Sequence, residues 1–329
     1  MSKKKTDKNL LFSIIFTFCF ILAGAGVYVY KNSGYSKEVI LQKANTYYIN
    51  EQYFMAAKYY AKAVELKADG AEMHRNYAIA LTKLSNYDSA VKNLKISSEI
   101  DPYNADTYYY LGNALYLKAQ SANSSDKFLQ AAEYLEKAAT LSPETEKAYL
   151  LIGLCYRSVG MQENARAWYR RALLSGNFSQ SGFYNLIGHT FREEERYKEA
   201  AGYYKRAIES DMGFVAAYCN LGDMYLKMND ANGALANYEK AIDINPEYIS
   251  AYLKIGSVYA GQDNYDEAIP FYLRALQINP DNDKANYLLA MAYKSIGRNG
   301  EAVEYLKTAA YRGSDEAIYE LRNIGIDLR

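Results

Sequence analysis

The sequence predicts an all-α protein built as an α-solenoid, a stack of repeated helix pairs. The first observation is a repeat of about 34 residues that begins near residue 37 and continues nearly to the C-terminus. The second is the recurrence of small residues at fixed places in that repeat, which indicates close helix approach. The third is a stripe of large apolar residues with a helical period beside those small residues.

Small residues mark every copy of the repeat. The marker alanines are Ala56, Ala90, Ala131, Ala165, Ala200, Ala234, Ala268 and Ala302. A second alanine follows seven residues later in seven of the eight copies, and Ser97 takes its place in the other. A glycine or alanine also precedes each marker: Ala44, Ala78, Gly112, Gly153, Gly188, Gly222, Gly256 and Ala290.

Residues 249–282 show the predicted helix pair. Tyr252 and Gly256 fall on one face of a first helix, because they lie four positions apart. A polar break at 261–264 separates this helix from a second one. The second helix is expected to end before Pro280, since proline disfavours helical geometry in the residue that precedes it. Large aromatics then fill the gaps that the small residues leave.

The repeat closely resembles the tetratricopeptide repeat family, whose pattern is aromatic-x2-Leu-Gly-x2-Tyr, then Ala-x3-Phe, Ala and Pro. The matching residues of the sixth copy are Tyr218, Leu221, Gly222, Tyr225, Ala234, Tyr238, Ala241 and Pro246. The resemblance covers roughly 280 of the 329 residues. It implies a right-handed α-solenoid of about eight helix-turn-helix repeats.

The predicted organisation has five parts. They are a basic, cytoplasmic N-terminus (1–9), a transmembrane helix or signal peptide (10–30), a linker (31–36), the repeats (37–314) and a capping helix (315–329). The eight predicted units are 37–70, 71–104, 105–145, 146–180, 181–214, 215–248, 249–282 and 283–314. The third is about seven residues longer than the others, and we expect residues 118–127 to form a Ser- and Asn-rich loop between its helices.

The N-terminal segment from Leu10 to Tyr30 contains no charged residue and is long enough, as a helix, to cross a bilayer core. Four lysines precede it, so the positive-inside rule predicts a cytoplasmic N-terminus with the repeats across the membrane. In a bacterium the repeats would lie in the periplasm. The alternative is a signal peptide cleaved after Ala25, which would give a secreted protein.

Composition excludes several classes of function. Net charge is zero and the charges are interleaved, so the basic stripe of a nucleic-acid binder is missing. Three cysteines cannot build a disulfide framework, and we expect them to be reduced. The chain has 36 tyrosines, which we interpret mainly as core residues in place of the family's usual Trp and Phe.

No catalytic constellation is present in the sequence. His74 occupies a core aromatic position, and no Cys, Asp or second His stands at metal spacing from His189. The sequence therefore predicts that the chain is not an enzyme, and that it takes no cofactor, no metal and no small-molecule substrate.

The resemblance implies a concave, peptide-binding groove lined by the first helix of each unit. Carrying over the family's inward positions in the third and fourth units gives Tyr109, Tyr110, Asn113, Tyr116, Leu117, Leu150, Leu151 and Leu154. The basic residues expected around them are Arg75, Lys83, Lys147, Arg157, Arg192, Lys227 and Lys254, and the acidic ones are Glu72, Asp106, Glu193 and Asp223. A competing interpretation is that the curvature of the superhelix or the 118–127 loop buries these inward-facing residues.

Some relatives in the resembled family grip a C-terminal carboxylate with Lys, Asn, Asn, Lys and Arg from three successive units. Only Asn185, Asn220 and Lys254 match that pattern here, while His189 and Ser250 replace an asparagine and a lysine. The sequence therefore does not predict such a clamp. We interpret His189 as lying on the concave face near Asn185.

Taken together, these features predict a membrane-anchored scaffold or adaptor that binds protein or peptide segments, in a bacterial envelope complex. The predicted ligand is a peptide with apolar anchors and some acidic residues. The alternatives are a secreted or surface interaction protein after signal cleavage, and a recognition subunit for an enzyme on another chain.

Overall fold

The computed structural model describes residues 36–176 and 178–327, and over these residues it is all-α, with seventeen helices and no strand. This confirms the predicted all-α class. The described chain forms two compact bodies, which we call the N-terminal body (through Met161) and the C-terminal body (from Gln162).

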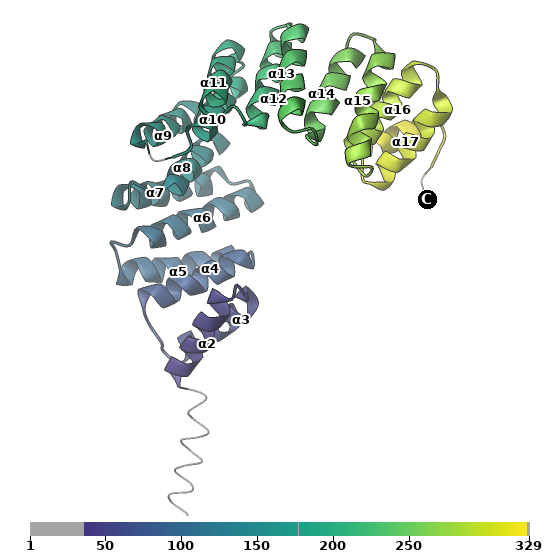
Figure 1. Cartoon of the computed structure of the whole chain (residues 1–329). Helices are drawn as coiled ribbons and strands as arrows, with labels where there is room; N and C mark the ends of the chain where they lie inside the picture. The colour runs from purple at the N-terminus through teal and green to yellow at the C-terminus, as the bar shows by residue number, and fades with distance from the viewer. Residues whose placement is uncertain (1–35, 177, 328–329) are drawn as a thin grey trace, which may run out of the picture. The chain divides into compact units, whose positions relative to one another are not determined.

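The N-terminal body contains seven helices, stacked side by side (Figure 1). They are α2 (Lys37–Ile49), α3 (Tyr53–Glu65), α4 (Ala71–Lys83), α5 (Tyr87–Ile100), α6 (Ala105–Ala122), α7 (Ser125–Leu141) and α8 (Glu146–Ser158). Consecutive helices pack against each other, and α4 also contacts α2 and α6. The alternate helices α2, α4, α6 and α8 therefore form one layer, which we call the first-helix surface of this body.

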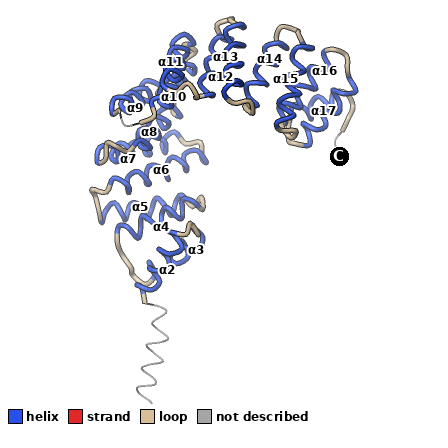
Figure 2. The backbone as a smooth tube through the Cα atoms, in the orientation of Figure 1, coloured by secondary structure: helices blue, strands red, loops and turns tan. Residues whose placement is uncertain are grey.

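The C-terminal body contains ten helices in the same kind of stack (Figure 2). They are α9 (Gln162–Ser175), α10 (Gln180–Glu193), α11 (Tyr197–Ser210), α12 (Val215–Lys227), α13 (Ala231–Ile244), α14 (Ile249–Ala260), α15 (Tyr265–Ile278), α16 (Asp283–Ser295), α17 (Asn299–Tyr311) and α18 (Asp315–Asn323). Here the first-helix surface is formed by α10, α12, α14 and α16, and the second helices are α9, α11, α13, α15 and α17.

In three pairs of the C-terminal body, a glycine of the first helix lies directly against a tyrosine of the second helix. A Cβ atom placed on Gly188, Gly222 or Gly256 would lie only 2.5–2.6 Å from the ring of a tyrosine. The three facing residues are Tyr204, Tyr238 and Tyr272, all fully buried or nearly so. The small residues found by sequence analysis therefore create the space for the aromatic core.

The C-terminal helix α18 packs on the last helix pair. Ala317 and Leu321 of α18 are fully buried in one cluster with Leu306 and Ala310 of α17. Ser314 caps the helix by accepting a hydrogen bond from the backbone N–H of Ala317 at 3.2 Å. This helix covers apolar side chains that the last pair would otherwise expose.

The prediction of a loop over residues 118–127 is wrong. Helix α6 continues to Ala122 and α7 begins at Ser125, so the extra residues lengthen both helices. The turn needs little chain because Asn123 adopts the left-handed conformation, with φ 46° and ψ 49°, and asparagine tolerates that region. No long loop is therefore available to cover the predicted lining.

The predicted transmembrane helix, residues 10–30, lies outside the described residues. Among the helices from residue 36 onward, none is both long enough and apolar enough to cross a membrane. The anchor and the localisation that depends on it stay predictions.

Substituting Gly222→Ala should destabilise the C-terminal body by about 1–3 kcal/mol, because its new methyl group would overlap the Tyr238 ring. The matched control is Gly202→Ala in α11, where nothing lies within 4 Å of the new Cβ atom. At that position alanine has a better helix propensity than glycine and should raise the free energy of unfolding by about 0.5–1 kcal/mol. Thermal unfolding midpoints of both variants check this, and equal shifts would contradict the packing argument.

Candidate functional site

The core tyrosines of the second helices reach the first-helix surface through their hydroxyl groups. Tyr238 donates a hydrogen bond of 2.7 Å to Asp223 Oδ1, the residue directly after Gly222. In the N-terminal body, Tyr60 donates likewise to Asn45 Oδ1 at 2.6 Å. In each case the ring lies in the core, while the hydroxyl orients a polar side chain at the surface.

An ion pair joins two successive first helices at this surface. Lys254 Nζ of α14 lies 2.7 Å from Asp223 Oδ1 and 2.8 Å from Oδ2 of α12. The ammonium group also lies 5.8 Å from the centre of the Tyr238 ring. Burial first, and then the hydrogen bond to Asp223, raise the pKa of Tyr238, so the hydroxyl stays a donor at neutral pH.

Two hollows of the C-terminal body meet at this ion pair. The larger, of about 480 Å³, is lined by Asp223, Leu226, Tyr238, Ile249, Ser250, Leu253, Lys254, Ser257, Asn282 and Lys284. The other, of about 410 Å³, shares Asp223, Leu226 and Lys254 and adds Arg192, Glu193, Glu195, Tyr197, Met224 and Lys227. The larger hollow combines an apolar wall with hydroxyls and two lysines against one carboxylate. It suits an apolar side chain beside a polar or acidic group.

Three predicted residues of the C-terminal body come together in a polar chain. Asn220 donates to Asn185 Oδ1 at 2.8 Å, and Asn185 Nδ2 lies 3.1 Å from His189 Nε2. The other ring nitrogen of His189 lies 3.2 Å from the Tyr204 hydroxyl. His189 therefore lies near Asn185 on the first-helix surface, and the chain links α10 to α12.

Predicted residues of the N-terminal body form a second group, on α4 and α6. Tyr109 and Tyr110 are half-buried, with ring centres 5.2 Å apart. Burial raises the pKa of both hydroxyls. Arg75 donates to the Thr107 hydroxyl at 3.5 Å, and its charge partly offsets the rise that burial imposes on the pKa of Tyr48 and Tyr110. A tyrosine-rich surface with one arginine results.

The other predicted residues of this body lie on α6 and α8. Tyr116 accepts a hydrogen bond from Gln120 at 2.9 Å and meets the Phe128 ring edge-on. Arg157 counteracts the rise that burial imposes on the pKa of Tyr116. Lys147 is exposed, whereas Asn113, Leu117, Leu150, Leu151 and Leu154 are half-buried. Neighbouring helices thus cover part of each leucine, although the predicted loop does not exist.

Sequence analysis missed the larger hollow. It counted Asp223 among the surrounding charges but did not predict that this carboxylate pairs with Lys254 and accepts from Tyr238. Nor did it single out Leu253, Asn282 or Lys284, which line the hollow. The feature of the sequence that could have indicated the hollow is the residue directly after Gly188, Gly222 or Gly256, because the hydroxyl of the core tyrosine reaches that position.

Reactive groups are few among the described residues. No cluster of three or more His, Cys, Asp or Glu side chains that could hold a metal occurs within 36–176 and 178–327. Cys155 and Cys219 are free and buried, and burial raises the pKa of each thiol to about 12. At neutral pH both are protonated, which makes them poor nucleophiles.

Family models match the chain in four places. A model of the TPR repeat matches residues 222–263, and models of the tetratricopeptide repeat match residues 116–181, 184–216 and 259–323. The matched residues cover most of α10 to α17, which include the four helices of the first-helix surface of the C-terminal body, α10, α12, α14 and α16.

Two curated proteins are similar over part of their length. Small glutamine-rich tetratricopeptide repeat-containing protein 2 of Mycosarcoma maydis is 31% identical over 96 residues, 29% of this chain and 25% of that protein. The BBSome complex member BBS4 homolog of Drosophila melanogaster is 22% identical over 160 residues, 45% of this chain and 31% of that protein. The chain thus matches a quarter to a third of either relative.

Solved structures with a similar backbone include two crystal structures of MamA. They align with 51% and 57% of this chain and 96% and 99% of their own, at 25% and 26% identity and TM-scores of 0.42 and 0.43. YrrB, described as a TPR protein with an unusual peptide-binding site, aligns over 59% of this chain and 96% of its own, at 22% identity and a TM-score of 0.42.

The hydrogen bond between Tyr238 and Asp223 should contribute to stability. A double-mutant cycle with Tyr238→Phe and Asp223→Ala is expected to give a coupling free energy of about 1–2 kcal/mol, because the acceptor is charged. In contrast, Asp243→Ala breaks an exposed pair with Lys240 and should cost less than about 0.5 kcal/mol. Denaturant unfolding gives the free energy of unfolding of the wild type and of each variant. A coupling free energy near zero between Tyr238 and Asp223 would refute the stabilising role of their hydrogen bond.

Proposed function

Because this chain belongs to the tetratricopeptide-repeat family, we propose that it is a membrane-anchored adaptor whose first-helix surfaces bind segments of partner proteins. The observation that supports this most directly is the larger hollow beside Lys254 and Asp223. It is lined by residues of α12 to α14 and by two residues at the start of α16. A site shared by successive helices suits an extended segment better than a compact small molecule.

The chemistry of the hollow favours a segment with an apolar side chain next to an acidic group. Leu226, Ile249 and Leu253 provide the apolar wall. Lys284 is exposed, and within the described chain no salt bridge involves it. Lys254 is already paired with Asp223, so a ligand carboxylate would first be attracted by Lys284.

The tyrosines of the N-terminal body supply a second place for the same kind of contact. Half-buried Tyr109 and Tyr110 offer apolar rings with a hydroxyl each, and the Arg75 guanidinium stands close by. Tyrosine and arginine are enriched among the residues that dominate binding energy at protein interfaces. We therefore assign the predicted residues of α4, α6 and α8 to partner binding as well.

The membrane anchor is the remaining part of the proposal. The uncharged residues 10–30 and the lysines before them support a segment that spans a membrane, with the repeats on the far side. In a bacterium this places the adaptor in an envelope complex.

Filling the hollow should weaken binding without unfolding the protein. In Ser250→Arg, a long charged side chain enters the 480 Å³ space from a half-buried position. We expect a partner that copurifies with the full-length protein to be bound at least about tenfold more weakly. Ser210→Arg, at an exposed position at the end of α11, is the matched control.

Tyr109→Ala and Leu150→Ala test the N-terminal body in the same binding measurement. Quantitative mass spectrometry of the captured partner gives the readout, and circular dichroism verifies folding. If all three variants keep the partner at the wild-type level, the first-helix surfaces are not the binding site.

The mature N-terminus decides between an anchor and a signal peptide. We expect protein isolated from native membranes to retain residues 10–30 and to resist extraction by alkaline carbonate. A chain that begins at Gly26 and appears in the soluble fraction would instead establish the secreted form. Peptide mapping of the N-terminus distinguishes the two.

A further inference from the structure

The second helices α9 and α11 carry the same short motif at equivalent places. Residues 168–172 are Trp-Tyr-Arg-Arg-Ala and residues 203–207 are Tyr-Tyr-Lys-Arg-Ala. The second residue of each motif is the core tyrosine and the fifth is the second repeat alanine, so the two copies are in register. The aromatic residue and the two basic residues of each motif lie outside the buried core.

In each motif an arginine stacks on the aromatic residue one turn before it. The guanidinium carbon of Arg171 lies 4.8 Å from the centre of the Trp168 ring, and that of Arg206 lies 5.2 Å from the Tyr203 ring. Such a contact restrains the guanidinium beside the ring while its N–H groups remain able to bond a carboxylate. Both arginines are therefore suited to an anionic group.

The two motifs are connected through Phe191 at the end of α10. Arg166 of α9 stacks on one ring with Arg196, at 4.4 and 4.5 Å from the centre of Phe191. The same phenylalanine stacks on Tyr203 of α11, with ring centres 5.3 Å apart. Arg166 and Arg196 also share the carboxylate of Glu194. These contacts fix both α9 and α11 to the same end of α10, the helix on which each of them packs.

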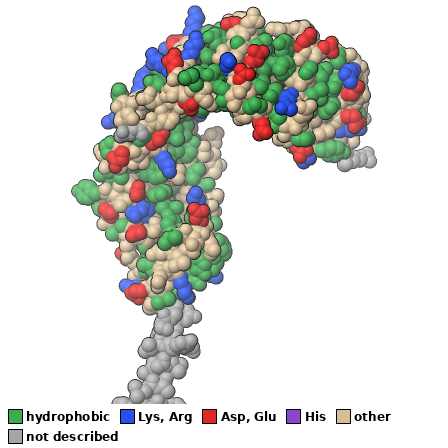
Figure 3. Space-filling model, in the orientation of Figure 1, with side chains coloured by type: hydrophobic (Ala, Val, Ile, Leu, Met, Phe, Trp, Pro, Cys, Tyr) green, Lys and Arg blue, Asp and Glu red, His purple; other side chains and the backbone are tan. Residues whose placement is uncertain are grey.

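The basic side chains of this surface are largely without acidic partners. Arg171, Lys205 and Arg206 are exposed, and within the described residues no salt bridge involves them. Arg170 pairs with Glu163 at 3.2 Å. Lys and Arg side chains accordingly gather along the edge of the molecule over α9 and α11 (Figure 3).

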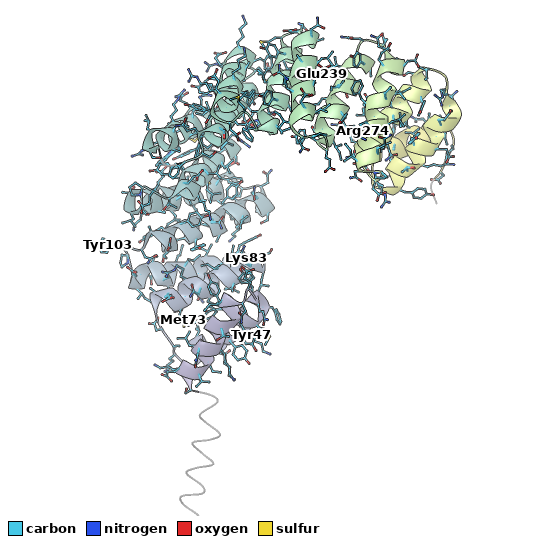
Figure 4. The ribbon with its side chains drawn as sticks, viewed as in Figure 1. Tyr47, Met73, Lys83, Tyr103, Glu239 and Arg274 are labelled. Atoms are coloured by element: carbon cyan, nitrogen blue, oxygen red, sulfur yellow. The ribbon has the colours of Figure 1, made fainter. Side chains whose placement is uncertain are left out.

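The pattern stops at the next second helix, α13. Glu239 stands at the position of Arg170 and Lys205 (Figure 4). Lys240, at the position of Arg171 and Arg206, pairs with Asp243 at 3.1 Å. The surface is thus confined to two neighbouring helices, and Lys240 supplies an internal control.

We propose that the α9–α11 surface, formed by Trp168, Arg170, Arg171, Tyr203, Lys205 and Arg206, binds an acidic segment of a partner protein. Its composition of Trp, Tyr and Arg is that of protein-interface hot spots. Glu163, Glu199 and Glu209 lie on the same two helices and would oppose the continuous negative charge of a nucleic acid or lipid surface. The separate carboxylates of an acidic peptide segment can be placed away from these glutamates. This inference does not depend on the first-helix surface.

Geometry also sets the spacing of the acidic groups. Helices α9 and α11 both pack on α10 rather than on each other, so one ligand has to span the space between their arginines. Carboxylates that reach Arg171 and Arg206 together are therefore expected apart along the segment rather than adjacent, and three residues of extended chain, about 10 Å, serve as the test spacing. A segment with acids at that spacing should bind more tightly than one with the same acids placed adjacently.

Fluorescence anisotropy with the full-length protein tests the proposal. The probes are short labelled peptides with two glutamates three residues apart, two adjacent glutamates, or two glutamines. We expect the first to bind most tightly, the glutamine peptide at least about tenfold more weakly, and added salt to weaken the acidic peptides. The double variant Arg171→Ala/Arg206→Ala should lose about tenfold for the first peptide, and Lys240→Ala should lose nothing.

A charge swap separates binding from folding defects. Arg171→Glu/Arg206→Glu should reject the glutamate peptide and bind a matching lysine peptide instead, which an unfolded protein would not do. Equal affinity of the wild type for glutamate and glutamine peptides would overturn the proposal. The proposal would also be overturned if the peptides do not bind, while anionic phospholipid vesicles or single-stranded DNA bind in a way that depends on Arg171 and Arg206.

Discussion

The contact between a glycine of one helix and a tyrosine ring of the next is the constraint on which the rest depends. At Gly188, Gly222 and Gly256 the missing side chain is the space that the ring occupies. This lets the two helices approach closely while a large apolar surface is buried between them. Because every repeat contacts only its neighbours, a close approach of two helices has to be achieved again in each pair. The partners can differ, since Gly112 faces Leu135 instead of a tyrosine.

The same tyrosines link the core to the surface. A ring fixed on glycine places its hydroxyl at the residue that follows, which is His189, Asp223 or Ser257. At Asp223 this orients a carboxylate that holds Lys254 of the next first helix. The ion pair and the hollow beside it are therefore consequences of core packing. The second helices α9 and α11 also carry side chains away from the core. The aromatic residue and the arginine beside each core tyrosine lie outside the buried core and contact each other.

The sequence by itself determined the all-α class and the succession of helix pairs, because these follow from local periodicity and from small residues that recur at fixed spacing. The resemblance to the tetratricopeptide repeat family also implied that Asn185, His189 and Asn220 share one surface, and the three form a hydrogen-bonded chain. The prediction failed at residues 118–127, because a Ser- and Asn-rich composition suggested a loop where two helices simply continue.

Only the tertiary structure decided which polar groups meet. Asp223 and Lys254 are 31 residues apart in sequence, and their contact depends on how α12 and α14 are rotated and offset against each other. The hollow beside them and the stacking of Phe191 of α10 on Tyr203 of α11 depend on offsets of the same kind. The period of the α-helix fixes the direction in which each side chain leaves its own helix. The distance between side chains of different helices is fixed only when the cores pack.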